Sequence, residues 1–261
     1  MGLLDRLRLP EVKDIQSLDA PGTTELHARI IRAKPFLKQV YLDFYRDLAG
    51  RIERGAGERI VELGSGGGCI KEVIPEAVTS DVVAAGGVDR VFSAAEMPFE
   101  DGSVGAFVMV DVLHHIKQPR EFFREAVRCL RMGGKVVMIE PANTAWSRFV
   151  YGNFHHERFE PDAGWELDRE GALSESNQAL AWIIFHRDRE VFEREFPQLQ
   201  ITAIRLHSPL RYILSGGLQW RALAPGWSYP TVKGIEWLLR PVAGLVAMFE
   251  TIELKKIQPS G

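Results

Sequence analysis

The spacing of hydrophobic positions along the chain changes near residue 58. Before it, apolar side chains recur every three or four positions from Leu26 to Leu48, which predicts amphipathic helices with a break at Pro35. From 58 to 140, short apolar runs with the length of buried strands alternate with amphipathic stretches. Residues 1–55 are therefore expected to form a helical cover over a core that contains a sheet.

The expected strands of the core alternate with expected helices. In chain order the pattern predicts the strand RIVEL, the helix CIKEVIP, the strands AVTSDV, DRVFSA and GAFVMV, the helix PREFFREAVRCLRMGG and the strand KVVMIE. Strands that alternate with helices in this way form a mostly parallel sheet with helices on both faces. The predicted fold class is thus a doubly wound α/β domain.

The rest of the chain differs in composition from this core. Residues 141–197 follow the fifth expected strand and are richer in histidine, tryptophan and charge, so we expect an insertion that ends in the helix RDREVFEREF. LQITAIRL is expected to be the last strand, which gives a core of 56–206. Residues 207–261 are an apolar and aromatic C-terminal segment, expected to form a lid, an interface or a membrane-proximal region.

A glycine-rich loop, residues 64–68, directly follows the first expected strand. Between a buried strand and a helix, such a loop presents unpaired backbone amides, and glycine lets a ligand touch the backbone, although a tight turn alone could account for it. Two carboxylates strengthen the case for a ligand. Glu62 precedes the loop, and Asp81 ends the next strand, where an acid can accept hydrogen bonds from a ribose diol.

Composition and charge exclude several classes of protein. The chain of 261 residues has a net charge of -3 and no dense cluster of lysine and arginine, so nucleic acid is not an expected partner. Two cysteines are too few for a disulfide framework, which favours a reducing, cytoplasmic setting. The charged N-terminus does not resemble a signal peptide, and no uninterrupted apolar run reaches the ~18 residues of a membrane span, so we expect neither export nor a span.

Four motifs between residues 60 and 141 occur in a characteristic order: VELGSGGG, SDV, SAAEMPFEDGSVGAFVMVDVLHHI and RCLRMGGKVVMIEP. Together they resemble class I S-adenosylmethionine-dependent methyltransferases, particularly the methyltransferase type 11 group that includes quinone-biosynthesis enzymes. The segments AKPF, HHE and ILSGG extend the resemblance to a bacterial branch of that family. The resemblance implies a Rossmann-like seven-stranded sheet and S-adenosyl-L-methionine as the cofactor.

Carried over onto this sequence, the resemblance also implies a cofactor site. The glycine-rich loop would contact the methionine part of the cofactor. Asp81, after the second strand, would hold the ribose, and Asp111, after the fourth strand, would face the methionine amine. The family usually has an aspartate for the adenine amino group where this chain has a serine, so that contact is a hydroxyl or is weaker. The residues expected to bind the cofactor are Glu62, Gly64, Ser65, Gly66, Gly68, Asp81, Ser93, Ala94 and Asp111.

A general base is needed only if the methyl acceptor is not already ionised, because the sulfonium methyl group is itself electrophilic. His155 and His156 lie in the insertion, where this family places substrate contacts, and a neutral imidazole there could act as the base. Alternatively, these two histidines only cap the loop. His114 and His115 are expected to pack near the cofactor. The spacing in HHERF does not match a zinc motif, so no metal is expected.

All six tryptophans follow residue 140. Tryptophan suits an apolar substrate pocket or a membrane interface, whereas ordinary core packing or a homodimer interface is the plainer explanation. The tail VKGIEWLLRPVAGLVAMFETIELKK could lie on a bilayer or form a lipid-facing lid. Peripheral membrane contact and a homodimer are therefore both open at this point.

The sequence thus predicts an enzyme that transfers a methyl group from S-adenosyl-L-methionine to a small-molecule, apolar or lipid-linked acceptor. Two alternatives stay open. An NAD(P)-dependent oxidoreductase would share the glycine loop and the ribose acid, but Cys69 stands where its fingerprint requires a glycine. A methyltransferase-like protein that binds cofactor or lipid without catalysis would share the whole motif order, and Ser93 leaves that alternative open.

Overall fold

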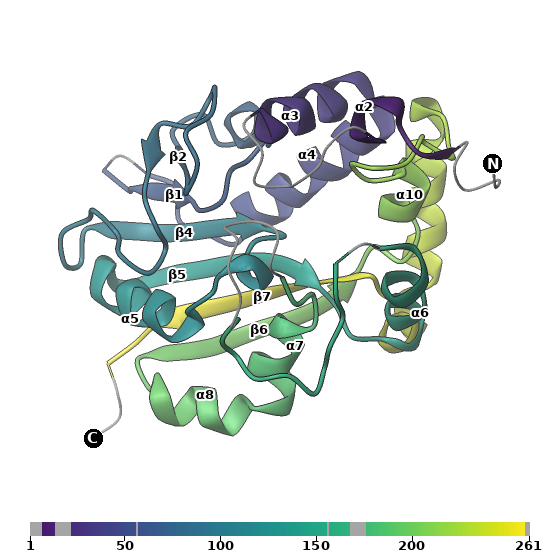
Figure 1. The fold of residues 1–261 in the computed structure, drawn as a ribbon. Helices are drawn as coiled ribbons and strands as arrows, with labels where there is room; N and C mark the ends of the chain where they lie inside the picture. Colours follow the sequence, from purple (N-terminus) through teal and green to yellow (C-terminus); the bar gives the residue numbers. More distant parts are fainter. Residues whose placement is uncertain (1–6, 14–21, 56, 156, 168–175, 259–261) are drawn as a thin grey trace.

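The computed structural model describes residues 7–13, 22–55, 57–155, 157–167 and 176–258, which contain a seven-stranded sheet with helices on both faces (Figure 1). The strand order is β3-β2-β1-β4-β5-β7-β6, with β7 antiparallel to β5 and β6 and the other pairs parallel. The strands are β1 (Ile60–Glu62), β2 (Val78–Asp81), β3 (Arg90–Val91), β4 (Val104–Val110), β5 (Leu130–Pro141), β6 (Leu199–His207) and β7 (Phe249–Lys256). The predicted fold class is confirmed.

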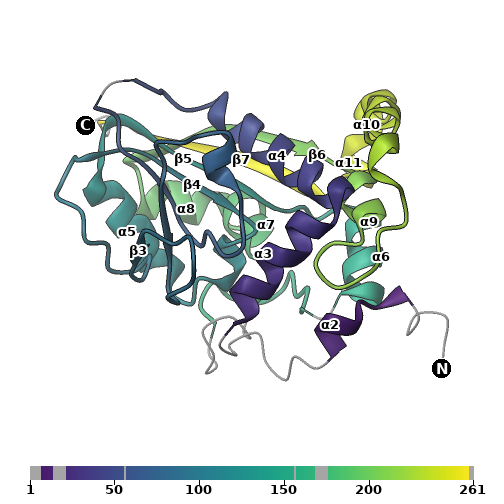
Figure 2. The same ribbon diagram turned by 90° about the horizontal axis from the view of Figure 1, so that it is seen from above.

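Helices α3 and α4 lie on one face of this sheet, and α5, α7 and α8 on the other (Figures 1 and 2). The break at Pro35 is confirmed, since α3 ends before it and α4 begins with it. The helices and helical turns are α2 (Pro10–Lys13), α3 (Thr23–Ala33), α4 (Pro35–Ala49), η1 (Ile70–Glu72), η2 (Leu113–His115), α5 (Pro119–Cys129), α6 (Ala145–Phe154), α7 (Leu180–Trp182), η3 (Ile183–Arg187), α8 (Arg189–Glu195), α9 (Arg211–Ser215), η4 (Gly226–Ser228), α10 (Tyr229–Leu238), η5 (Arg240–Val242) and α11 (Ala243–Val246).

Strand β4 shows why these sequences form a central sheet. Its side chains alternate between two hydrophobic clusters: Phe107 and Met109 pack with α5 and α8, while Ala106 and Val108 pack with α3 and α4. Successive side chains of a strand point to opposite faces, so a strand that is apolar at every position is buried on both. The sheet is therefore covered on each side, and its strand ends are left to form the site.

Three expectations about secondary structure are wrong. LQITAIRL is not the last strand, because the end of the supposed apolar tail returns as β7 between β5 and β6. The buried polar residues Glu250 and Thr251, which bond to His186 and Asp47, obscure that strand in the sequence. The expected helix CIKEVIP is only the short turn η1, and the helix expected from Pro119 to Gly134 ends at Cys129, where β5 follows.

Candidate active site

A cavity of about 1340 Å³ lies at the carboxyl ends of β1, β2 and β4, where parallel sheets of this kind bind ligands. Helices α3 and α4 form one wall, and α6 and α9 contribute to the others. Every residue that the sequence predicted for the cofactor lines this cavity, and so does His155. His156 lies outside the described residues.

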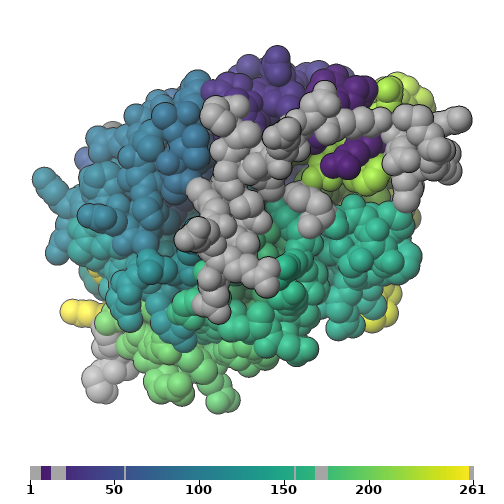
Figure 3. All heavy atoms as spheres, viewed as in Figure 1, coloured from purple at the N-terminus to yellow at the C-terminus, as the bar shows by residue number. Residues whose placement is uncertain are grey.

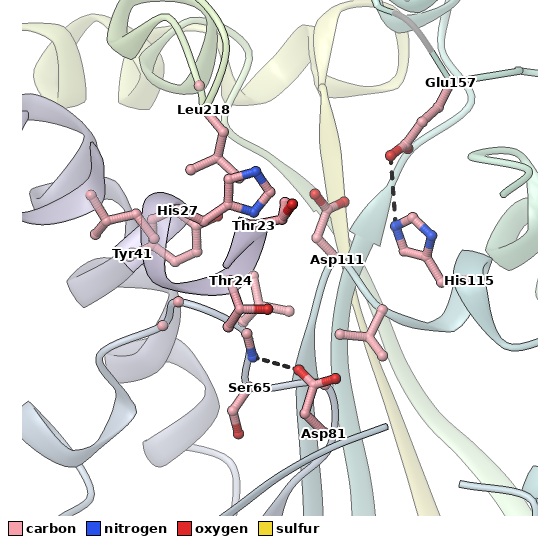
Figure 4. Close-up of a pocket in the computed structure, with 18 of the residues that line it drawn as sticks. Thr23, Thr24, His27, Tyr41, Ser65, Asp81, Asp111, His115, Glu157 and Leu218 are labelled. Atoms are coloured by element: carbon pink, nitrogen blue, oxygen red, sulfur yellow. Dashed lines mark hydrogen bonds and ion pairs between the residues drawn. The ribbon is translucent and has the colours of Figure 1, made fainter. Parts of the chain in front are cut away.

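The glycine loop is fixed to the end of β2 by three hydrogen bonds. The backbone N–H of Gly66 donates to Oδ2 of Asp81 at 2.9 Å (Figure 4), and the N–H of Ser65 donates to the carbonyl of Ser80 at 2.8 Å. The hydroxyl of Ser65 accepts from the N–H of Ser80. Gly66 has a φ of 50°, in the left-handed region that favours glycine, and a Cβ there would meet nothing closer than 3.8 Å. The protein therefore leaves the side-chain position at Gly66 unfilled.

Two other glycines of the loop have no room for a side chain. A Cβ on Gly67 would lie 2.3 Å from the backbone of Ala28 in α3, and one on Gly68 would lie 2.2 Å from the hydroxyl of Tyr45 in α4. From the sequence, the glycines are expected to let a ligand touch the backbone. The close approach of the helical cover accounts for these two, so part of the motif serves packing.

Two carboxylates face the cavity: Glu62 is buried, and the side chain of Asp111 is 30% exposed. Burial raises the pKa of Glu62 to about 7, against hydrogen bonds from Ser65 and Tyr45 that lower it. Burial also raises the pKa of Asp111 to about 7, against the charge of His114 that lowers it and together with the charges of Glu140 and Glu157 that raise it. Among the described residues, neither Oε2 of Glu62 nor Oδ1 of Asp111 has a hydrogen-bond partner. Both oxygens can therefore accept from a cationic or hydroxylic ligand group.

The conformation of Asp111 supports a role in binding. Its φ is 62°, a left-handed value that is uncommon outside glycine and costs conformational energy. Figure 4 shows its carboxylate between the strand ends and the cover, facing His27 and Tyr41 across the cavity. Sequence reasoning missed these two cover residues, because 1–55 carried no motif and was expected only as a cover.

A buried histidine joins the end of β4 to the insertion. Nδ1 of His114 lies 2.7 Å from Oε2 of Glu140, and its Nε2 lies 3.4 Å from Oε2 of Glu157. Burial alone would lower the pKa of His114, but these two carboxylates raise it well above its usual value. Burial would likewise raise the pKa of Glu157, but His114 holds it well below the usual value. The expectation that His114 packs structurally fits this network.

His115 and His155 both line the cavity but differ in their surroundings. Nε2 of His115 lies 3.7 Å from Oε1 of Glu157 (Figure 4). Nδ1 of His155 accepts from the backbone N–H of Glu157 at 3.3 Å and lies 3.1 Å from the side-chain amide nitrogen of Gln178. Because that lone pair is engaged, neutral His155 carries its proton on Nε2 and presents a donor there.

The same residues include two groups with the geometry of a metal site. Ligand atoms of His114, His115 and Glu157 lie within 4.8 Å of one another, as do those of Asp111, His114 and Glu140. Both groups share His114, whose Nδ1 is already within hydrogen-bonding distance of Glu140. Glu140 and Glu157 raise the pKa of His114, and a protonated imidazole has no lone pair to offer a metal ion. The prediction that no metal is used stays a prediction.

Comparison with known proteins identifies the family of the domain that forms this site. Residues 61–138 match the family model described as a methyltransferase domain. Residues 61–138 are a class I methyltransferase domain. Such domains use S-adenosylmethionine, so the chain is an S-adenosylmethionine-dependent methyltransferase. No curated protein matches it in sequence.

Solved structures resemble this methyltransferase in fold. The geranyl diphosphate C-methyltransferase of Streptomyces coelicolor A3(2), solved with Mg²⁺, geranyl diphosphate and S-adenosyl-L-homocysteine, is 17% identical with a TM-score of 0.46, over 94% of this chain and 90% of that one. A geranyl diphosphate methyltransferase with SAM is 19% identical with a TM-score of 0.45, over 94% and 95%. The [4+2]-cyclase SpnF is 13% identical with a TM-score of 0.49, over 82% and 81%.

The residues present fit this cofactor. Asp81 is held in place by Gly66 and by the N–H of Val83 at 3.2 Å, which leaves carboxylate lone pairs for a pair of ribose hydroxyls. Oδ1 of Asp111, which has no hydrogen bond and lies 4.0 Å from Nδ1 of His114, can accept from an ammonium group. Ser93 lines the cavity where an adenine ring would be expected, and its hydroxyl accepts from the N–H of Ala95 at 3.2 Å. That hydroxyl can still donate to a ring nitrogen.

Proposed function

We propose that the protein methylates an apolar small molecule or a lipid-linked acceptor. The size of the cavity carries this proposal. A site for one drug-sized ligand has a volume of about 300–1,000 Å³. At about 1340 Å³ the cavity is larger, so it has room for a second molecule beside the cofactor.

The cofactor would occupy the side of the cavity nearest the strand ends. There Asp81 would hold the ribose, Gly64, Ser65, Gly66 and Gly68 would lie against the methionine part, and Asp111 would bind its ammonium group. Glu62 would support the loop, and Ser93 and Ala94 would contact adenine. The bound cofactor supplies an electrophilic methyl group, and the residues of the chain orient the acceptor and exclude water.

The acceptor would occupy the opposite side, which is mostly apolar. Its lining comes from α2, α6, α9 and the turn that follows α9. The apolar residues on this side are Val12, Val150, Phe154, Ile213, Leu218 and Leu223. A wall of this kind binds a hydrophobic group through burial of apolar surface. Because apolar and lipid-linked acceptors reside in bilayers, peripheral membrane contact is part of this proposal.

His115 is the candidate general base for an acceptor that is not already ionised. Its imidazole lines the cavity, and the Glu157 carboxylate can stabilise the imidazolium that forms when a proton is taken up. The sequence suggested His155 or His156 for this role. As a donor through Nε2, neutral His155 is better suited to orient an acceptor oxygen than to deprotonate it.

The direct test is transfer of a labelled methyl group from S-adenosylmethionine into extracted lipids and apolar metabolites. We expect label in an organic-soluble product with the wild type and, at limiting cofactor, much less with Asp81→Asn. Binding of the cofactor without label in any extract fraction would instead support a protein that has lost its chemistry. Label confined to water-soluble material would contradict the apolar acceptor.

A further inference from the structure

Exposed apolar side chains gather at one end of the molecule. Of the twelve large apolar side chains that are exposed among the described residues, nine come from α6 or from the segment that runs from the end of α9 to the end of α11. Trp227 is 82% exposed, and Trp237, Leu238 and Leu245 each exceed 60%. The nine are Phe149, Phe154, Leu223, Trp227, Ile235, Trp237, Leu238, Val242 and Leu245. Isolated exposed apolar residues are ordinary, but a cluster marks an interaction surface.

The elements that carry these residues lie together. Helix α11 packs against α6, and α10 adjoins both η4 and η5. Figures 1 and 2 show α6, α9, α10 and α11 at the same end of the fold, beyond the end of β5. In the space-filling view, α6 lies at the right-hand side, and part of the segment with α10 is visible above it (Figure 3). We call this surface the helical end, defined by residues 145–154 and 221–246.

The helical end is positively charged although the chain as a whole is not. Its cations are Arg148, Arg221, Lys233 and Arg240, all four exposed, and Lys233 is paired with Asp43 of α4 at 2.7 Å. Its single carboxylate, Glu236, is buried and bonded to the backbone of Leu210 and Arg211. The whole chain has a net charge of -3, so its negative charge lies mainly outside the helical end.

A strip of aromatic rings links this surface to the cavity. Along α6, Trp146 stacks on Phe149 with ring centroids 5.9 Å apart, and Phe149 meets Phe154 edge-on at 5.9 Å. Phe154 is 43% exposed and also lines the cavity, and Leu223 combines the same two properties. Apolar surface therefore continues from the exposed helical end to the proposed acceptor side.

We propose that the helical end docks on an anionic lipid bilayer and receives the acceptor from it. Exposed tryptophans suit the headgroup region, and cations are drawn to the negative surface of anionic lipids. A second copy of the chain fits less well, because two such surfaces would bring the three arginines of one against those of the other, with no exposed carboxylate of the helical end between them. The proposal rests on the proposed function for the identity of the cargo, but not for docking itself.

Vesicle flotation tests the docking step directly. The full chain is mixed with vesicles of phosphatidylcholine alone or of phosphatidylcholine with phosphatidylglycerol, at low and at physiological ionic strength. We expect flotation with the anionic vesicles, weakened by salt. Trp227→Ser with Trp237→Ser should reduce partitioning by about tenfold. Arg148→Gln with Arg240→Gln should reduce it by about fivefold per arginine.

A matched control is Val91→Ser with Met132→Ser. These side chains are 54% and 52% exposed and lie on β3 and at the start of β5, away from the helical end. We expect this variant to float like the wild type. Absence of wild-type flotation, equal loss in the control, or a dimer in light scattering that the tryptophan variant dissociates would each overturn the proposal. Calorimetry with S-adenosylmethionine separates these results from failure of the proposed function, since cofactor binding should be unchanged in all three variants.

Discussion

His114 and Glu157 are joined across the site, with Nε2 of the imidazole 3.4 Å from Oε2 of the carboxylate. His114 belongs to the turn after β4, and Glu157 follows α6 in the insertion after β5. Glu140 contacts the other nitrogen of the same ring at 2.7 Å. The insertion is thus attached to the sheet through a buried charged histidine.

This pair predicts a stability that depends on pH. The raised pKa of His114 gives a stabilisation that is complete below the usual value of 6.5 and is lost as pH rises through the raised value. The lowered pKa of Glu157 gives a stabilisation that is complete above 4.5 and is lost as pH falls through the lowered value. The free energy of unfolding, measured with urea, should therefore differ most between wild type and Glu157→Gln from pH 4.5 to 6.5. A difference that does not change with pH would contradict the charged pair.

Asp111 predicts a pH dependence of cofactor affinity. Because burial raises its pKa to about 7, the carboxylate that pairs with an ammonium group is depleted at lower pH. Affinity for S-adenosylmethionine should fall as pH drops below 7, by up to about tenfold per unit. Asp111→Asn should bind more weakly at pH 8 and lose much of this dependence. Glu62 also has a pKa of about 7 beside the cavity, so Glu62→Gln is the control that assigns the effect.

Gly68 predicts a cost in stability that arises from packing. A Cβ there would lie 2.2 Å from the hydroxyl of Tyr45, so Gly68→Ala should lower the free energy of unfolding by about 1–3 kcal/mol. Tyr45→Phe removes that hydroxyl, so Gly68→Ala should cost less in a Tyr45→Phe background than in the wild type. The carbonyl of Ser65, at 2.8 Å from the same Cβ, limits the recovery. Equal stability of Gly68→Ala and wild type would show that the cover does not press on the loop.

His115 and His155 predict different kinetic defects. His115→Gln should lower kcat by about 10²–10⁴-fold for an acceptor that must lose a proton, and should change the pH dependence of kcat. His155→Gln keeps a donor and should act mainly on KM. Melting temperatures establish that both variants fold. A larger loss of kcat in His155→Gln than in His115→Gln would return the base to His155.

Local patterns carried most of what the sequence predicted. The strand, the glycine loop and Asp81 lie close together in the chain and follow one another in a fixed geometry, so their meeting at one sheet edge could be inferred. Contacts between distant segments could not. Tyr45 and Ala28 explain two glycines only once α3 and α4 are placed against the loop.

The strand β7 and the histidine network show the same limit. Glu250 and Thr251 break the apolar pattern of β7, since their partners His186 and Asp47 come from elsewhere in the chain. Glu157 stood beside the expected catalytic pair in the sequence, but nothing local indicated that it would contact His114. Both the strand β7 and the contact between His114 and Glu157 therefore depend on partners that are distant in the chain.

The most direct test of the account is calorimetric titration of S-adenosylmethionine and S-adenosylhomocysteine into wild type, Asp81→Asn and Asp89→Asn. The Asp89 carboxylate accepts hydrogen bonds from the backbone N–H and the hydroxyl of Thr79, which lies on the same strand as Asp81. Asp89 does not line the cavity, so Asp89→Asn controls for changes near that strand. We predict that both ligands bind the wild type and Asp89→Asn, and that Asp81→Asn loses at least about tenfold in affinity, as expected for lost hydrogen bonds to a charged group. No binding to the wild type, or equal binding to Asp81→Asn, would contradict the cofactor site.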